Sequence, residues 1–239
     1  MTTLKTPLHE RVLKLARVLQ IYHRYRAIGL ENVPEEGPAV IAVSHSLATY
    51  DSALLGAAIY QRTGRLPRGL GDRAIFRTPF LRDWAMRIGM TEGSPEAGLE
   101  LLRDGHLLML APGGMLEALR PKADRYQICW DHRRGFVRLA VRARVPIILA
   151  ACPRADDIYR VYENPLTSIV YQTMRMPLPV ARGMGLTAIP RPVRLVHVVS
   201  EPIPPPEIPE GEGFESEIEK FHARLSTRMR ELMLQALRY

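Results

Sequence analysis

The sequence AVIAVSHSLATYDSALLG, residues 39–56, sets the structural class of this chain. Its first five residues are apolar and partly β-branched, which is typical of a buried strand. A short turn of small and polar residues follows, and a helix is predicted over residues 51–61, with Asp51 able to cap it. A strand that leads directly into a helix is a unit of an α/β protein.

The same alternation continues along the chain. Strands are predicted over 106–111, 145–151 and 193–199, and helices after Ser94 and over 134–143. A last helix has its apolar residues on one face: Phe214, Ile218, Phe221, Leu225, Met229 and Leu232. We predict an α/β fold with a central mixed sheet flanked by helices. An N-terminal amphipathic helix is expected within residues 1–30. Residues 31–239 are expected to form one domain that ends in the C-terminal helix.

The N-terminal helix is predicted over residues 8–27. Its apolar positions recur every three or four residues: Leu8, Val12, Leu15, Leu19 and Tyr22. Arginine, lysine and histidine occupy much of the remaining surface. Two interpretations fit this pattern: a helix docked on the core, or a helix that lies in an anionic lipid interface with its cations at the headgroups.

The chain is basic, with a formal net charge of +8, and only four of its 33 basic residues are lysine. Such a surface suits nucleic acid, an anionic membrane or a phosphorylated ligand. Nucleic acid is not an expected partner, because no helix-turn-helix, zinc or RNP pattern occurs. Cys129 and Cys152 belong to no metal-binding motif, so no metal is expected. Neither a signal peptide nor a membrane-spanning segment is predicted.

His45 and Asp51 are the first candidate catalytic residues. A histidine at the end of a strand, with its Nδ1–H held by a carboxylate, can present Nε2 as a general base. Such a base can remove the proton of a hydroxyl group that attacks an acyl carbon. The alternative is structural: Asp51 caps a helix, and His45 is a satisfied core residue.

The second candidate is the segment LLMLAPGGMLEALR, residues 107–120. Its glycines, Gly113 and Gly114, follow a predicted buried strand at a place where backbone can approach a ligand closely. Free N–H groups there could bind an anion or an oxyanion. Glu117 and Arg120 are three residues apart and share one side of the next helix. The alternative is a tight turn with a surface ion pair.

These motifs together resemble the glycerophospholipid acyltransferase superfamily, and most closely the branch of type 2 diacylglycerol acyltransferases. The resemblance covers roughly residues 28–205. The matching motifs are His45…Asp51, GDRAIFRTPFL at 71–81, Pro112-Gly113-Gly114…Glu117, Arg133-Arg134-Gly135-Phe136, and residues 145–151. One motif departs from the family, since its histidine and aspartate are usually separated by four residues and here by five.

The resemblance implies acyl transfer from acyl-CoA, the co-substrate, to a lipid alcohol, with no other cofactor. By resemblance, His45 would be the general base and Asp51 the residue that orients it. Gly113 and Gly114 would place the oxyanion or the alcohol, and Glu117 would hold the acceptor. The residues implied to meet the phosphates of coenzyme A are Arg73, Arg77, Arg133 and Arg134.

The family's phosphate-gripping "EGTR" segment is absent, which favours a neutral acceptor such as mono- or diacylglycerol. Two alternatives stay open: a lysophospholipid acceptor, or a lipid- or acyl-CoA-binding protein without turnover. The expected location is the cytoplasmic face of an anionic membrane, as a peripheral or monotopic protein in glycerolipid biosynthesis.

Overall fold

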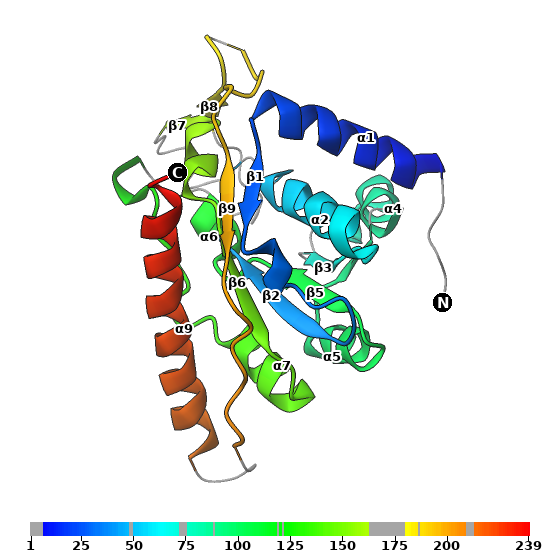
Figure 1. The fold of residues 1–239 in the computed structure, drawn as a ribbon, viewed down its shortest axis with the longest axis vertical. Coiled ribbons are helices and arrows are strands. Elements are labelled where there is room, and N and C mark those ends of the chain that lie inside the picture. Colours follow the sequence, from blue (N-terminus) through cyan, green and yellow to red (C-terminus); the bar gives the residue numbers. More distant parts are fainter. Residues whose placement is uncertain are drawn as a thin grey trace.

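A seven-stranded sheet forms the centre of the protein (Figure 1). The computed structural model describes residues 7–47, 50–71, 76–87, 89–118, 120, 122–162, 180–185, 187–208 and 213–239. The strand order is β1-β9-β6-β2-β5-β3-β4. The strands are β1 (Arg26–Ile28), β2 (Ala39–Val43), β3 (Arg68–Gly71), β4 (Met90–Glu92), β5 (Leu107–Leu110), β6 (Ile147–Ala151) and β9 (Val196–Val199).

The sheet is mixed, because β9 pairs antiparallel with β6 while the other neighbouring strands are parallel. The α/β class with a mixed sheet, predicted from the sequence, is therefore confirmed. A small second sheet pairs β7 (Arg160–Tyr162) with β8 (Val180–Arg182).

Helices cover both faces of the sheet. One face packs against α2 (Tyr50–Thr63), on which α1 (Pro7–Tyr22) lies, and the other against α5 (Pro95–Arg103), α7 (Gly135–Ala143) and α9 (Phe214–Ala236) (Figure 1). The shorter helices are α4 (Pro79–Arg87) and α6 (Gly114–Ala118), and the 3-10 turns are η1 (Leu30–Asn32), η2 (Lys122–Asp124) and η3 (Pro153–Asp157).

Strand β2 shows why its sequence is an uninterrupted apolar run. Val40 and Ala42 belong to the core beneath α7 and α9, whereas Ala39, Ile41 and Val43 pack toward α2. All five are buried. A parallel strand covered on both sides needs apolar residues at every position, which an alternating pattern would not supply.

The C-terminal helix α9 confirms the face predicted from its periodicity. Ile218, Phe221, Leu225, Met229 and Leu232 are all buried in the main core. The first residue of the predicted set, at position 214, packs partly buried against them.

The N-terminal helix differs from its prediction in length and orientation. It ends at Tyr22, and residues 26–28 form edge strand β1 because the chain turns at Arg24, whose φ is 45°. The docked face carries buried Ala16 and, from the predicted stripe, half-buried Leu19, while Leu15 of the same stripe is 60% exposed. Periodicity therefore identified the docked face only in part, because apolar residues occur on both sides of this helix.

Candidate functional site

Three parallel strands bring the candidate residues to one edge of the sheet. β2 lies between β5 and β6, so the carboxyl ends of all three strands meet there. His45 follows β2, Gly113 follows β5, and Asp156 lies in η3 after β6. This edge is where open α/β sheets place their ligands.

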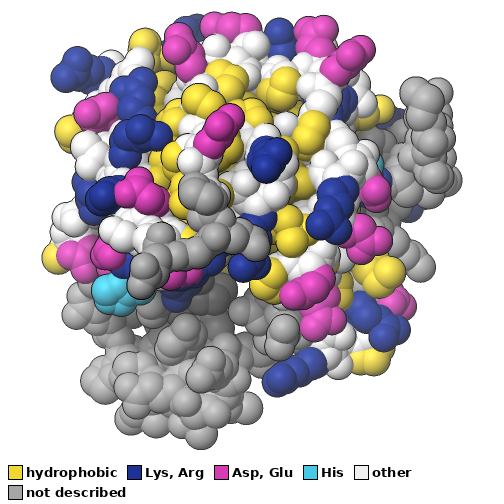
Figure 2. Space-filling view, turned by 90° about the horizontal axis from the view of Figure 1, so that it is seen from below, with side chains coloured by type: hydrophobic (Ala, Val, Ile, Leu, Met, Phe, Trp, Pro, Cys, Tyr) yellow, Lys and Arg dark blue, Asp and Glu magenta, His cyan; other side chains and the backbone are white. Residues whose placement is uncertain are grey.

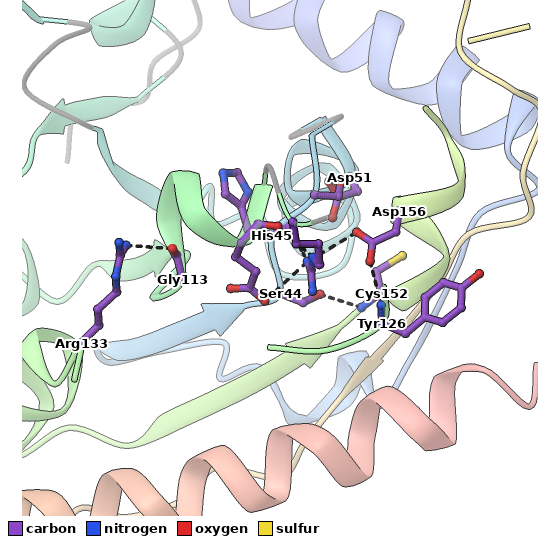
Figure 3. Close-up of polar contacts among 11 residues, drawn as sticks. Ser44, His45, Asp51, Gly113, Tyr126, Arg133, Cys152 and Asp156 are labelled. Atoms are coloured by element: carbon purple, nitrogen blue, oxygen red, sulfur yellow. Dashed lines mark hydrogen bonds and ion pairs between the residues drawn. The ribbon is translucent and has the colours of Figure 1, made fainter. Parts of the chain in front are cut away.

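His45 is half-buried, and its Nδ1 atom is buried without a hydrogen-bond partner among the described residues (Figure 3). Burial, together with the smaller effect of the positive charge of Arg120, lowers the pKa of the imidazole to about 4. The ring is therefore neutral at pH 7 and has a lone pair that can accept a proton.

Asp51 does not hydrogen-bond to His45 among the described contacts, and Figure 3 draws none between them. Its Oδ1 atom accepts a hydrogen bond of 3.2 Å from the Ser46 hydroxyl, and its Oδ2 atom is buried without a partner. Asp51 lies in the first turn of α2, near buried Cys152, whose pKa is raised by burial and secondarily by the charge of Asp51. Burial raises the pKa of Asp51 itself to about 7.

The glycines of the Pro-Gly-Gly segment have steric roles. A Cβ atom on Gly113 would lie 1.8 Å from Oε2 of Glu117, so only glycine leaves room for that carboxylate. Gly114 has a φ of 51°, which favours glycine, and its N–H donates to the carbonyl of Ala111. The Gly114 N–H is thus already hydrogen-bonded to backbone. The sequence analysis had suggested that it could donate to an oxyanion.

Glu117 is fully buried beside this turn. Burial raises the pKa of its carboxyl group to about 7, and the neighbouring Arg120 opposes that shift. The two side chains form an ion pair of 3.7 Å in which both partners are almost completely buried. The pair predicted as a possible surface interaction is thus an interior one.

The four arginines that the resemblance assigns to phosphate lie in different places. Arg133 donates a 2.8 Å hydrogen bond from Nη1 to the Gly113 carbonyl, so it reaches the candidate site (Figure 3). Arg134 points to α9 and pairs with Glu219 at 2.6 Å. Arg77 is exposed, and Arg73 falls outside the described residues.

Asp156 is a site residue that the sequence analysis did not identify. Its carboxylate accepts from the Tyr126 backbone N–H at 2.9 Å and pairs with Arg120 at 3.4 Å. Its position could have revealed it in the sequence, because Asp156 lies one turn beyond β6, at the sheet edge where His45 also lies. A small cavity lies here, lined by Leu47, Ala118, Arg120, Arg125, Ala155, Asp156 and Tyr159.

The described residues contain no group of His, Cys, Asp or Glu side chains arranged to hold a metal ion.

Basic and acidic side chains are interspersed with apolar ones on the face shown in Figure 2. On that face the positive charge is therefore not gathered into the continuous basic surface that a nucleic acid would need.

Comparison of the sequence with known proteins gives three findings. The sequence pattern of the diacylglycerol acyltransferase family matches residues 68–236. The chain is 33% identical over 186 residues to a human protein described as "DGAT1/2-independent enzyme synthesizing storage lipids", covering 77% of this chain and 55% of that one. It is 30% identical over 176 residues to diacylglycerol O-acyltransferase 2B of Umbelopsis ramanniana, covering 68% and 50%.

Among solved structures, the fold is similar to the 1-acyl-sn-glycerophosphate acyltransferase of Thermotoga maritima. The TM-score is 0.59 with 13% sequence identity, over 93% of this chain and 78% of that one. The chain spans about half the length of the curated relatives it matches. The family match begins after His45 and Asp51, so it includes the Gly113–Glu117 segment but not that pair.

Proposed function

Because this chain belongs to the diacylglycerol acyltransferase family, we propose that it transfers a fatty acyl group from acyl-CoA to the hydroxyl of a neutral lipid, such as mono- or diacylglycerol. The observation that carries the proposal is the position of His45. Its neutral, half-buried imidazole stands at the sheet edge where the Gly113 turn and Glu117 also lie.

In the proposed reaction, Nε2 of His45 accepts the proton of the acceptor hydroxyl as that oxygen attacks the thioester carbonyl carbon. The tetrahedral intermediate expels the sulfur of coenzyme A, and the imidazolium returns its proton to that sulfur. No covalent enzyme intermediate is needed. We assign the Gly113 N–H as the candidate oxyanion donor, since Arg133 holds the carbonyl of the same residue.

The acceptor is proposed to be uncharged because the buried cation beside His45, Arg120, is neutralised by acidic groups of the protein itself. Glu117 and Asp156 share the charge of Arg120 in a buried cluster, so this arginine is not free to bind a phosphate. We propose that the exposed Arg77, together with Arg73, meets the phosphates of coenzyme A.

We also propose that the protein works at the cytoplasmic surface of an anionic membrane. None of the described helices is long and apolar enough to cross a bilayer. Helix α1 nevertheless exposes Leu15, Val18 and Ile21, each at least 60% accessible, and the cations Lys14 and Arg17 are exposed beside them. Apolar side chains flanked by cations are the pattern of an interfacial helix.

The decisive assay is acyl transfer from a labelled acyl-CoA to diacylglycerol in liposomes. We expect His45→Ala to abolish product, and full activity in that variant would refute the mechanism. Lysophosphatidic acid in competition tests the acceptor, because preferential acylation of it would show a lysophospholipid enzyme. Acyl-CoA binding without product from any acceptor would show a binding protein.

Liposome flotation tests the membrane surface. Val18→Glu should release the protein from vesicles that contain anionic lipid. Leu234→Glu, at an exposed residue of α9, is the matched control and should leave flotation unchanged. Equal flotation of both variants and wild type would refute the assignment of α1.

A further inference from the structure

The buried guanidinium of Arg120 joins the three segments that leave the sheet edge. Its Nη2 atom donates to the backbone carbonyl of His45, and its Nε atom donates to the carbonyl of Glu117 at 2.8 Å. The same group forms the ion pair with Asp156 at 3.4 Å. The side chain is only 4% exposed.

His45 lacks the side-chain support that the sequence predicted. Its Nδ1 atom has no partner among the described residues, and Asp51 instead accepts from the Ser46 hydroxyl. The backbone next to the ring is held, however. The Ser44 N–H donates to the carbonyl of Ala150 at 3.0 Å, and Arg120 holds the His45 carbonyl itself.

We propose that Arg120 is a positioning residue that orients the imidazole of His45 by fixing its backbone against the Glu117 helix and Asp156. This inference rests on the proposed function, in which His45 is the general base. Arg120 itself touches no reacting atom in this scheme.

Arginine suits this role better than lysine. Its planar group carries five donors in a fixed arrangement, so one side chain can reach two carbonyls and a carboxylate in different directions. A lysine ammonium would keep the charge but could not keep all three contacts. The buried positive charge is compensated by Glu117 and Asp156.

The test compares Arg120→Lys and Arg120→Gln with a matched arginine. Arg65 also holds backbone, donating to the carbonyls of Pro34, Gly37 and Gly105, but it does not contact the His45 segment in the described structure. We expect Arg120→Lys to lower kcat on the order of 10- to 100-fold with little change in the KM for acyl-CoA. Arg65→Lys should lower thermal stability and leave kcat unchanged.

The charge gives a second measurement. The titratable and charged groups nearest the His45 segment are Arg120 and Glu117; Asp156 lies behind them as the partner of Arg120, and Asp51 lies in the first turn of α2. Loss of the Arg120 charge in Arg120→Gln should raise the pKa of His45 and so move the acidic limb of the kcat–pH profile to higher pH. Arg120→Lys should leave that limb in place.

An NMR titration of labelled histidine separates this inference from the proposed function. The His45 resonance, assigned with a His45→Gln variant, should shift in both Arg120 variants and stay unchanged in Arg65→Lys. An unshifted resonance in folded Arg120→Lys would overturn the positioning role, whether or not acyl transfer is found. Absence of acyl transfer in the wild type would refute the proposed function alone.

Discussion

The ionisation of Asp51 gives the sharpest test of the site geometry. Burial raises the pKa of its carboxyl group from 3.8 to about 7, and Ser46 is the described side-chain donor to it. A carboxylic acid whose pKa is raised on folding stabilises the native state below its unfolded pKa. That stability is lost as the pH rises through the folded pKa.

The magnitude follows from this shift. Between pH 5 and pH 8 the free energy of unfolding should fall by about 2–3 kcal/mol through Asp51 alone. Asp51→Asn cannot ionise, and its side-chain oxygen can still accept from Ser46. The variant should therefore gain about 2–3 kcal/mol on the wild type between the two pH values, whatever its stability at pH 5.

Urea unfolding of both proteins at pH 5 and pH 8, followed by circular dichroism, measures this difference. Asp83→Asn, at an exposed residue of α4, controls for the loss of one negative charge. The stability of Asp51→Asn minus that of wild type should become more positive from pH 5 to pH 8. A difference that is unchanged or becomes more negative would refute the reasoning, because it would show Asp51 already ionised at pH 5.

Three further substitutions test the packing. Gly113→Ala should cost about 1–3 kcal/mol in urea unfolding and lower acyl transfer, because the new Cβ would displace Glu117; unchanged activity would contradict this. Leu225→Ala should cost about 2–5 kcal/mol by calorimetry, since this α9 residue is fully buried; a loss below 1 kcal/mol would contradict the assigned packing. Ser94→Ala should cost about 1 kcal/mol, because the Ser94 hydroxyl accepts from the Ala97 N–H at 3.1 Å; an unchanged melting temperature would disprove the cap.

The elements that the sequence predicted correctly depend on short-range patterns. The strand of 39–43, the capped start of α5 at Ser94 and the buried face of α9 are each specified by residues within a few turns of one another. Alternating strands and helices then imply an α/β sheet, whose strand ends gather polar residues. His45 and Glu117 were found in this way.

The errors and omissions come from contacts between segments far apart in the chain. Helix α1 has apolar residues on both sides, and its contact with α2 determines which side is covered. Arg120 and His45 are 75 positions apart, and the arginine reaches the histidine backbone because β5 lies beside β2. Sequence spacing alone could not indicate that contact.

The amino-acid order was therefore sufficient for the α/β class, the strand-to-helix turn at His45 and the family resemblance, since these depend on neighbouring residues. The surroundings of each side chain required the folded molecule. Burial of Asp51 away from the imidazole, and of Arg120 between three segments, depends on how the ends of β2, β5 and β6 pack together. Desolvation and charge pairing act through space, so they follow the packed arrangement and not the order of residues along the chain.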